Sequence, residues 1–440
     1  MPLFLSREQD RKRCLYDQGL GRRHDQIPRE TRQPASRRQR GRDCPAPGTP
    51  AGTCMRDPGR RLRLLLVGGG HSHLEVLRRF GRGSLPNVEL LMISAYAEHH
   101  YSGMVPGFLA GQYREESVRF LLEPLVSAMG GVFRQGSVAS LHPADQAVVL
   151  TDGTRVPYDL VSFGVGSRPA GSQSAEVASH ASVVKPMSRV VELHHRLLAA
   201  AKSESEGAGK AYHAGVVGGG AAGVEIVLAM DAFLRDEGRR RDLFLVEAGE
   251  SILEGYPRGF RRLILRIFAD RSIRVMTGTR VAGVEPEALL LAGGRRLEAH
   301  LTVWLTGAVG DPLFRTSGLA VDERGFMLVD DGLRSVTDQR VFGAGDCVTL
   351  ENYPDTPKAG VYAVRQGPVL WESLRAAVLG GRPPRYRPQD GFLSILNTGD
   401  GKALLHYKGF IVHSRWAFSL KDWIDHRFME KYKRLVPSSS

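Results

Sequence analysis

Three glycines in the stretch AGVVGGGAAGVEIVLAM have the spacing with which a backbone can hold a diphosphate. The apolar run before them predicts a strand, and the apolar pattern after them predicts a helix. Gly218 permits a tight turn, Gly220 lets the backbone approach a pyrophosphate, and Gly223 lets the helix pack closely on the strand. The N-terminus of that helix would face the phosphates, since its free N–H groups favour anions. The sequence therefore predicts a dinucleotide site here.

Glu247 ends the second predicted strand of this unit, in DLFLVEAG, 24 residues after Gly223. A carboxylate near this spacing hydrogen-bonds the adenosine ribose 2′-OH and repels a 2′-phosphate. The spacing therefore predicts NAD in preference to NADP. The structural alternative is a glycine-rich turn followed by an unrelated surface glutamate.

Another glycine cluster lies earlier in the chain, in LLLVGGGHSHLEVL. Gly68 and Gly70 match the first two positions of the fingerprint, but His73 stands where the third glycine is expected. After the next apolar strand, VELLMIS, Ser94 replaces the expected acid. Three interpretations are a nucleotide site, a metal site built from His71 and His73, and chance. The metal site is disfavoured because no carboxylate or thiol cluster stands beside the two histidines.

Three further motifs follow in a fixed order. SFGVGSRP contains Gly166, VWLTGAVG contains Gly307, and RVFGAGDC contains Gly345 and Asp346. Together with the two glycine clusters, they resemble the two-dinucleotide flavoproteins, the pyridine nucleotide-disulfide oxidoreductases and their relatives. The resemblance covers about residues 62–435 and implies an α/β fold with two Rossmann-like dinucleotide-binding domains, one for FAD and one for NAD, plus a short C-terminal segment.

The resemblance also implies the cofactors. The first glycine cluster would bind FAD and the second NAD(P)H, with NADH preferred because of Glu247. Asp346 would bond the FAD ribitol or pyrophosphate. We expect the following cofactor-binding residues: Gly68, Gly70, His71, Ser94, Gly166, Gly218, Gly220, Gly223, Glu247, Gly307, Gly345 and Asp346.

A subgroup is indicated by what replaces the cysteines of this family. Disulfide reductases carry a C-x4-C pair after the first glycine cluster, but this chain has only Cys14, Cys44, Cys54 and Cys347. A loop broken by glycine and proline, YSGMVPGFLAGQY, stands there instead. That loop, GGGHSHLEVL, KAGVYAVRQGPVL and WIDHRFM resemble a subgroup close to type II NADH dehydrogenases, whose members are also fused to, or encoded beside, selenophosphate synthetase. We expect no redox-active disulfide.

The implied reaction passes a hydride from NADH to FAD and the electrons to a quinone or another small acceptor. The cofactor supplies the difficult chemistry, and the protein binds and orients. We expect Lys358 to neighbour the flavin, Glu225 to stand beside the nicotinamide, and Tyr101, with Ser102 and Pro106, to line the acceptor side. The structural alternatives are a surface lysine, a carboxylate in the first turn of a helix, and an ordinary loop.

The acceptor is less well specified. Type II NADH dehydrogenases carry A-Q-x-A-x-Q after the strand-end aspartate, whereas residues 360–365 read GVYAVR, although Gln366 follows. This departure puts quinone reduction in question. One alternative is a soluble reductase that serves a protein or a selenium-metabolism acceptor. The other is a non-enzymatic flavin- and NADH-binding regulatory or interaction protein.

Strands alternate with helical patterns from residue 62 onward, as in a doubly wound α/β fold. The family layout implies two segments of an FAD-binding domain, 62–184 and 315–388, around an NAD(P)H-binding domain at 185–314. A C-terminal segment, 389–440, follows the proline-rich break GGRPPRYRPQDG.

The C-terminal stretch 414–432 predicts an amphipathic helix. Apolar residues recur there at helical spacing: Trp416, Leu420, Trp423, Ile424 and Phe428. Such a stripe packs on the core of its own protein or rests in a membrane interface. Both interpretations stay open, because the polar side mixes acidic with basic residues.

The 440 residues suffice for two or three domains. No apolar run approaches the roughly 18 residues of a membrane span, so an integral membrane protein is not expected. Of the net charge of +13, +8 lies in residues 1–61, which hold 15 Lys and Arg against 7 Asp and Glu. This leader lacks a hydrophobic period and is predicted to be disordered. A gene-model extension ahead of a true start at Met55 is favoured, and a nucleic-acid arm is the alternative.

The position of the cysteines favours a reducing compartment, since none lies between Cys54 and Cys347. We expect a cytoplasmic protein, with peripheral contact at the cytoplasmic membrane face as the alternative. No metal ion and no nucleic-acid partner are expected, and a homodimer is left open.

Overall fold

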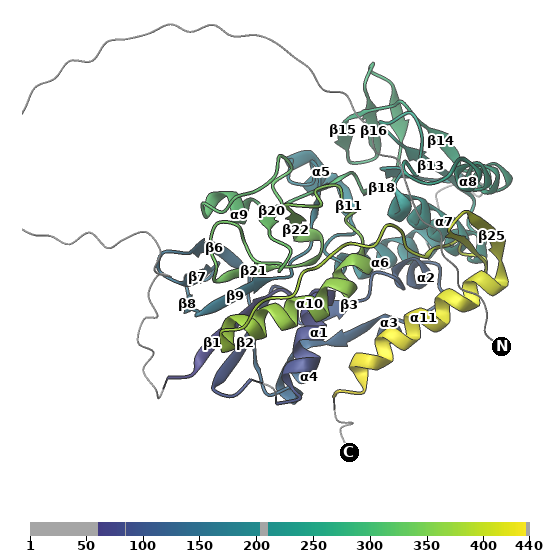
Figure 1. Ribbon diagram of the computed structural model, residues 1–440. Coiled ribbons are helices and arrows are strands. Elements are labelled where there is room, and N and C mark those ends of the chain that lie inside the picture. Colours follow the sequence, from purple (N-terminus) through teal and green to yellow (C-terminus); the bar gives the residue numbers. More distant parts are fainter. Residues whose placement is uncertain (1–59, 84, 203–209, 437–440) are drawn as a thin grey trace, which may run out of the picture. The chain divides into compact units, whose positions relative to one another are not determined.

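The computed structural model describes residues 60–83, 85–202 and 210–436 (Figure 1). Residues 1–59, with Met55 and the three N-terminal cysteines, lie outside the described part. The predictions about the leader therefore stay predictions.

The first glycine cluster follows the central strand of a parallel five-stranded sheet. The strand order is β21 (Val341–Gly343), β9 (Leu160–Phe163), β1 (Leu62–Val67), β2 (Val88–Ser94) and β5 (Val132–Gln135). All neighbouring pairs are parallel. β1 is nearly all apolar and mostly buried, as expected inside a parallel sheet.

Helix α1 (His71–Phe80) packs against α10 (Gly360–Leu379), and the two contact each other along the sheet (Figure 1). The Ser72 hydroxyl donates to the Ala363 carbonyl at 2.7 Å. A Cβ at Gly367 would stand 2.8 Å from Glu75 Cβ, so this glycine permits the close approach. The packing brings the N-termini of both helices to the same place.

The second glycine cluster lies in another parallel sheet. Its strand order is β11 (Ala181–Val183), β18 (Leu301–Trp304), β12 (Tyr212–Val217), β13 (Arg241–Val246) and β14 (Arg274–Met276). β12 leads through the glycines into α7 (Ala221–Asp236). Both sheets thus contain the strand, glycine turn and helix of a Rossmann-like unit, and the predicted fold class is confirmed.

Two contacts lie close to the domain limits predicted around residues 184 and 314. β11 already pairs with β18 in the second sheet. Phe314 already packs in the hydrophobic core of the first sheet. The sequence motifs mark the glycine turns but not the places where the chain crosses between sheets, so the finer division stays a prediction.

Smaller elements complete these two units. The antiparallel sheets are β6 (Val138–His142), β7 (Ala147–Leu150) and β8 (Arg155–Pro157), and β15 (Val281–Glu285), β16 (Ala288–Leu291) and β17 (Arg296–Glu298). The two-stranded pairs are β3 (Glu98–His100) with β4 (Arg119–Leu121), β10 (Arg168–Pro169) with β19 (Ala308–Val309), and β20 (Met327–Val329) with β22 (Val348–Leu350). The remaining helices of these units are α2 (Val105–Leu109), α3 (Glu115–Val118), α4 (Leu122–Ala128), α5 (Ala175–His180), α6 (Arg189–Lys202), α8 (Arg258–Asp270), α9 (Pro312–Thr316) and the 3-10 turn η1 (Gly345–Cys347).

The C-terminal segment forms an antiparallel sheet, β23 (Ser394–Asn397), β24 (Ala403–Tyr407) and β25 (Phe410–Ser414), followed by α11 (Arg415–Lys433). The helix expected over 414–432 is thereby confirmed.

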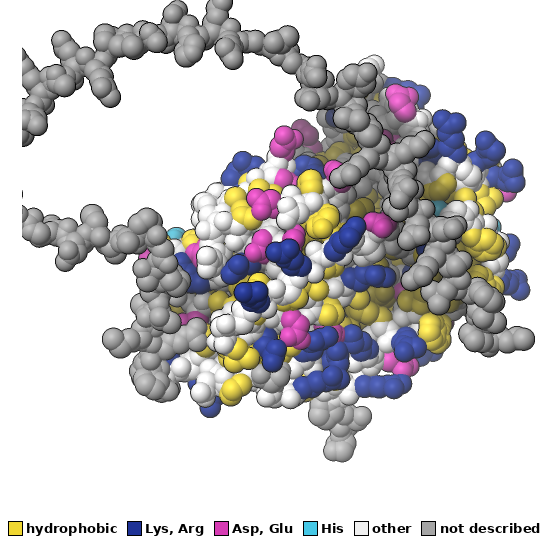
Figure 2. All heavy atoms as spheres, in the orientation of Figure 1, with side chains coloured by type: hydrophobic (Ala, Val, Ile, Leu, Met, Phe, Trp, Pro, Cys, Tyr) yellow, Lys and Arg dark blue, Asp and Glu magenta, His cyan; other side chains and the backbone are white. Residues whose placement is uncertain are grey.

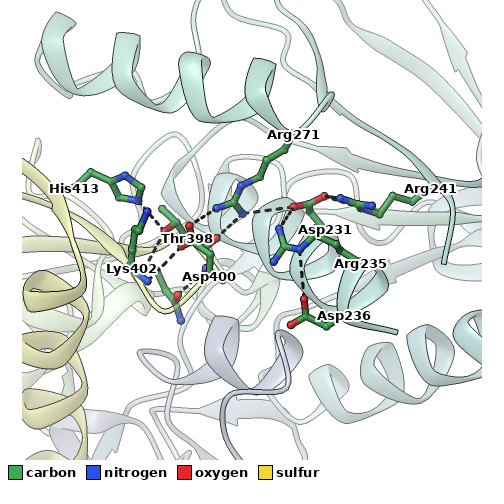
Figure 3. Close-up of polar contacts among 11 residues, drawn as sticks. Asp231, Arg235, Asp236, Arg241, Arg271, Thr398, Asp400, Lys402 and His413 are labelled. Carbon is green, nitrogen blue, oxygen red and sulfur yellow. Dashed lines mark hydrogen bonds and ion pairs between the residues drawn. The ribbon is translucent and has the colours of Figure 1, made fainter. Parts of the chain in front are cut away.

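A buried charge cluster fastens this segment to α7 (Figure 3). The Asp231 carboxylate is fully buried and accepts from Arg241 Nε at 2.6 Å. Arg271 pairs with Asp231 at 3.5 Å and with Asp400 at 2.9 Å, and it donates to the Thr398 carbonyl at 2.6 Å. Arg271 therefore bridges the helix and the β23–β24 turn.

Asp231→Asn should lower the free energy of unfolding by about 3–5 kcal/mol, because Arg241 and Arg271 would keep their charges beside a neutral amide. Urea denaturation measures the change. Asp236→Asn is the control, since that carboxylate is exposed and pairs with Arg235 at the surface. We expect less than about 0.5 kcal/mol there. Equal effects at the two positions would contradict the role given to the buried carboxylate.

Candidate functional site

A cavity of about 1160 Å³ is lined by residues of both Rossmann-like units and of the C-terminal segment. It exceeds the ~300–1,000 Å³ of common small-molecule sites, so it has room for more than one ligand group. Most predicted site residues line it: Gly68, Gly70, His71, Ser94, Tyr101, Ser102, Gly166, Glu225, Gly345, Asp346 and Lys358. The others do not line it: Pro106, Gly218, Gly220, Gly223, Glu247 and Gly307.

His73 explains how the first glycine turn forms without its third glycine. Its Nδ1 donates to the Gly68 carbonyl at 2.6 Å, and its Nε2 accepts from the Ser162 hydroxyl at 2.9 Å. Gly164 leaves room for the ring, because a Cβ there would lie 2.8 Å from Nδ1. Burial lowers the pKa of His73 to about 4, so the ring is neutral. Since both nitrogens have protein partners, His73 is not free to bind a metal.

Gly68 takes φ +91°, and a Cβ at Gly70 would lie 2.5 Å from the Gly164 carbonyl oxygen. Both positions therefore require glycine for the turn itself. The helix that follows has no side-chain cap at Gly70, and α10 has none at Ala359. Residues at the starts of both helices line the cavity. Uncapped N-termini leave N–H groups for an anion, so the residues fit a pyrophosphate-containing cofactor.

His71 forms part of an aromatic wall on the cavity. Its ring centroid lies 5.0 Å from that of His99, 5.5 Å from Tyr101 and 5.4 Å from Phe428. Burial lowers the pKa of His71 to about 4 and that of His99 well below its usual range. These imidazoles therefore present uncharged rings to a ligand.

Asp346 follows β21 and forms an ion pair with Lys185 Nζ at 2.9 Å. Sequence reasoning missed Lys185, which carries no motif signal. Gly345 takes φ +81° and its N–H donates to Gln366 Oε1 at 2.6 Å. Gln366, which follows the stretch that lacks the quinone-site glutamines, thus holds the Gly345 turn and is buried.

Ser94 ends β2 at the position where an acid was expected. It is buried, lines the cavity, and its hydroxyl accepts from the Tyr96 N–H at 3.2 Å. A carboxylate that could bond a ribose is therefore replaced by a small hydroxyl group here.

Around the second glycine turn the backbone is equally tight. Gly218 takes φ +116°, and a Cβ at Gly223 would lie 1.9 Å from the Gly218 carbonyl oxygen. Glu247 directly follows β13, and its carboxylate accepts from the N–H groups of Gly219 at 2.6 Å and Gly249 at 2.7 Å. At Gly220 a Cβ would meet no atom within 4 Å, and α7 has no side-chain cap there. The turn is thus open to a ligand at Gly220.

Lys358 lies before α10, and its ammonium points toward β22. It donates to the Val348 carbonyl and, at 2.9 Å, to the Thr349 hydroxyl, and it lies 4.1 Å from the centre of the Phe326 ring. Burial lowers the pKa of Lys358 to about 8. The ammonium of Lys358 is thus held by protein groups, and its role toward a flavin stays a prediction.

Glu225 is half-buried in α7, lines the cavity, and accepts from the Asn397 N–H at 2.8 Å. Burial raises the pKa of Glu225 to about 7, a value at which a carboxyl can give or take a proton at neutral pH. Two charged residues of α11, Lys421 and Asp425, act on it electrostatically. Sequence reasoning missed both of them as site residues.

The predicted apolar stripe of α11 does not form a single packed face. Trp416 and Trp423 are 61% and 56% exposed, whereas Ile424 and Phe428 line the cavity. Between the two cavity residues, Asp425 is buried. The spacing of apolar residues predicted the helix correctly. Which of its faces is buried depends on the elements that pack against it, and the spacing does not reveal these.

One cluster of possible metal ligands stands among the residues described. Ligand atoms of Glu98, His100 and Glu115 lie within 4.8 Å of one another. Arg119 already pairs with both carboxylates, at 3.3 Å for Glu115. The guanidinium offsets one of the two negative charges, so the cluster has a structural explanation as an ion-pair network.

Comparison with known families gives one match that spans most of the chain. Residues 62–367 match the family described as pyridine nucleotide-disulphide oxidoreductase. The matched range begins at β1 and ends within α10, so it includes both glycine turns.

Two curated relatives carry names that state an activity. A probable NADH dehydrogenase of Dictyostelium discoideum is 27% identical over 50% of this chain and 54% of its own length. The type II NADH:quinone oxidoreductase of Haemophilus influenzae is 21% identical over 65% of this chain and 73% of its own length. The matched part thus spans only about half of the first relative.

Among solved structures, the sulfide:quinone oxidoreductase of Aquifex aeolicus superposes with a TM-score of 0.71. It covers 86% of this chain and 93% of that protein at 17% identity. At this identity the likeness concerns the fold.

Proposed function

The chain belongs to the pyridine nucleotide-disulphide oxidoreductase family, and from that premise we propose that it is an FAD-dependent NADH oxidoreductase that passes electrons to a quinone. The observation that carries the proposal is the shared cavity, onto which the uncapped starts of α1 and α10 both open. Names of relatives support NADH as donor and a quinone as acceptor.

The chain's own residues would bind and orient. The first turn, with Gly70 at the start of α1, would hold the FAD pyrophosphate, and the turn at Gly220 would hold that of NADH. When bound, FAD would accept the hydride and release the electrons to the acceptor. The start of α10 would place partial positive charge beside the cofactor. Neutral aromatic rings on the wall would exclude water.

A dithiol takes no part in this proposal. Within residues 60–83, 85–202 and 210–436 the only cysteine is Cys347, which is buried. Burial raises the pKa of its thiol to about 11, and a protonated thiol is a poor nucleophile.

The proposal is tested on the purified full chain by its visible spectrum. We expect a flavin band that NADH bleaches and that a soluble quinone restores. A coloured protein that NADH bleaches slowly and that no acceptor reoxidises would favour the regulatory alternative. Reoxidation by selenium compounds but not by quinones would favour the soluble reductase. A protein that cannot be loaded with flavin would contradict all three.

Glu247→Gln should weaken NADH binding about 10- to 100-fold relative to NADPH, since a hydrogen bond to a charged group contributes about 1.5–3 kcal/mol. The carboxylate would no longer bond a ribose hydroxyl or repel a 2′-phosphate. Dissociation constants of both nucleotides measure the effect. Glu250→Gln, on the following loop, is the control. An unchanged ratio of the two constants would contradict NAD preference.

We further propose that the C-terminal segment docks on a membrane surface. Three large hydrophobic side chains of β25 and α11 are exposed to solvent: Phe410 to 60%, Trp416 to 61% and Trp423 to 56%. Figure 2 shows hydrophobic side chains among Lys and Arg over the region of α8 and β25. Aromatic rings with flanking cations suit an anionic lipid interface. In the described part of the chain, no helix is long and apolar enough to cross a bilayer.

Docking is measured by co-sedimentation with vesicles of phosphatidylglycerol and of phosphatidylcholine. Binding should favour the anionic vesicles and fall at least about 10-fold in Trp416→Ser/Trp423→Ser. Leu379→Ser, at the exposed end of α10, is the control and should bind like the wild type. Absence of wild-type binding would contradict docking. Dimerisation, cytoplasmic location and a link to selenophosphate synthetase stay predictions.

A further inference from the structure

Helix α11 carries a lysine–aspartate pair on its buried side. Lys421 Nζ lies 2.7 Å from Asp425 Oδ2 and donates to the Gly103 carbonyl at 2.6 Å. The Tyr101 hydroxyl donates to Asp425 Oδ1 at 3.2 Å. Lys421 and Asp425 are 9% and 4% exposed, and both line the large cavity together with Tyr101. The pair is thus shielded from bulk water but not from a ligand.

Stability does not explain why these charges are buried. Apolar residues of similar volume in place of a buried ion pair often leave a protein equally stable or more stable. The neighbours Ile424 and Phe428 are apolar and line the same cavity. A role in chemistry accounts for the pair better than packing does.

Quinone reduction requires a proton that NADH does not carry. The balanced reaction is NADH plus a proton plus quinone, giving NAD⁺ and quinol. One proton and two electrons leave NADH as the hydride, so the second proton comes from solvent. Within a cavity, a titratable side chain on the wall can hand this proton to the acceptor.

Four other titratable groups on the cavity wall suit this step less well. Burial lowers the pKa of His71 to about 4 and that of His99 well below its usual range, so neither ring carries a spare proton at neutral pH. The ammonium of Lys358 points to Val348 and Thr349. The ammonium of Lys185 pairs with Asp346. Glu225 is a further candidate, and its carboxylate already accepts from the Asn397 N–H.

We propose that Lys421 donates this second proton to an oxygen of the bound acceptor, with Asp425 as the residue that positions it. The inference rests on the proposed quinone reduction. An ammonium has three N–H bonds, of which two point to Gly103 and Asp425. The third N–H bond breaks as an O–H bond forms on the acceptor. The neutral amine then takes a proton from water, and Tyr101 keeps Asp425 in place.

The proposal is tested by comparing the turnover rates of the NADH-loaded holoenzyme with two oxidants. A soluble quinone takes up protons, whereas ferricyanide accepts electrons alone. Lys421→Arg keeps a positive charge beside Asp425, but a guanidinium does not release its proton. We expect quinone turnover to fall about 100-fold or more while ferricyanide turnover changes less than about 2-fold. Lys431→Arg is the control, because it makes the same change elsewhere on α11. Lys431 pairs with Glu75 outside the cavity, so this variant should leave both rates unchanged.

Two further measurements separate chemistry from structure. Lys421→Met/Asp425→Leu removes both charges without leaving one unpaired, so it should melt within a few degrees of the wild type and bind quinone equally well by tryptophan fluorescence. Its quinone turnover should stay as low as that of Lys421→Arg. Recovery of quinone turnover in this double variant, or an equal fall with both oxidants in Lys421→Arg, would overturn the role of Lys421 as proton donor. Either result would leave the proposed quinone reduction standing. A wild type that reduces ferricyanide but no quinone would overturn both proposals.

Discussion

Gly220→Val is expected to weaken NADH binding about 100-fold or more while the fold and the flavin site stay intact. Gly220 caps α7 with φ −69° and ψ 177°, angles that any residue adopts. A Cβ there would meet no protein atom within 4 Å. The new side chain therefore costs the folded chain little, but it fills the space in front of the N–H groups that would hold the pyrophosphate. Two lost hydrogen bonds to a charged group, at about 1.5–3 kcal/mol each, give this factor.

The dependence of flavin bleaching on NADH concentration in stopped flow measures this change, and the flavin content after purification checks the first site. Gly223→Val serves as the contrast, because a Cβ there would lie 1.9 Å from the Gly218 carbonyl oxygen. We expect that variant to lose folded protein instead of nucleotide affinity. If Gly220→Val lowered the melting temperature as much as Gly223→Val, or bound NADH like the wild type, the open turn would not be the NADH site.

The two glycine turns could be predicted from the sequence because their requirements are local. Gly68 and Gly218 take positive φ, and that need is written into a few adjacent letters. The replacement of the third glycine by His73 was visible too, but its explanation was not. Room for that ring depends on Gly164, directly after β9, and its second partner is Ser162, within β9, both far along the chain. Only the sheet pairing of β1 with β9 brings them together.

The burial of residues in the C-terminal helix could not be predicted from the sequence. Lys421 and Asp425 have the i, i+4 spacing of a solvent-exposed ion pair but are buried, whereas Trp416 and Trp423 of the predicted apolar stripe are exposed. Helical periodicity defines faces, but it does not say which face meets a cavity. Lys185 is a similar case, since its pairing with Asp346 joins two segments that no motif connects.

Glu225→Gln is expected to remove about 2–3 kcal/mol of pH dependence from the stability of the protein. Burial raises the pKa of Glu225 from an ordinary 4.5 to about 7. Between these values the folded protein holds a proton that the unfolded chain has already lost. Folding stability from this group is therefore greatest below pH 4.5, falls as the pH rises toward 7, and is flat above it. In the glutamine variant this contribution is absent, because the amide does not titrate.

Urea denaturation of the wild type and of the variant at pH 5 and pH 8 gives the difference directly, since all other titrating groups cancel. The variant should gain about 2–3 kcal/mol relative to the wild type on going from pH 5 to pH 8. Glu237→Gln, at the exposed end of the same helix, should show no such gain. A buried carboxyl that were ionised at both pH values would leave the two curves parallel. Its proton would then be unavailable near neutral pH, and an acid or base role for Glu225 would lose its physical basis.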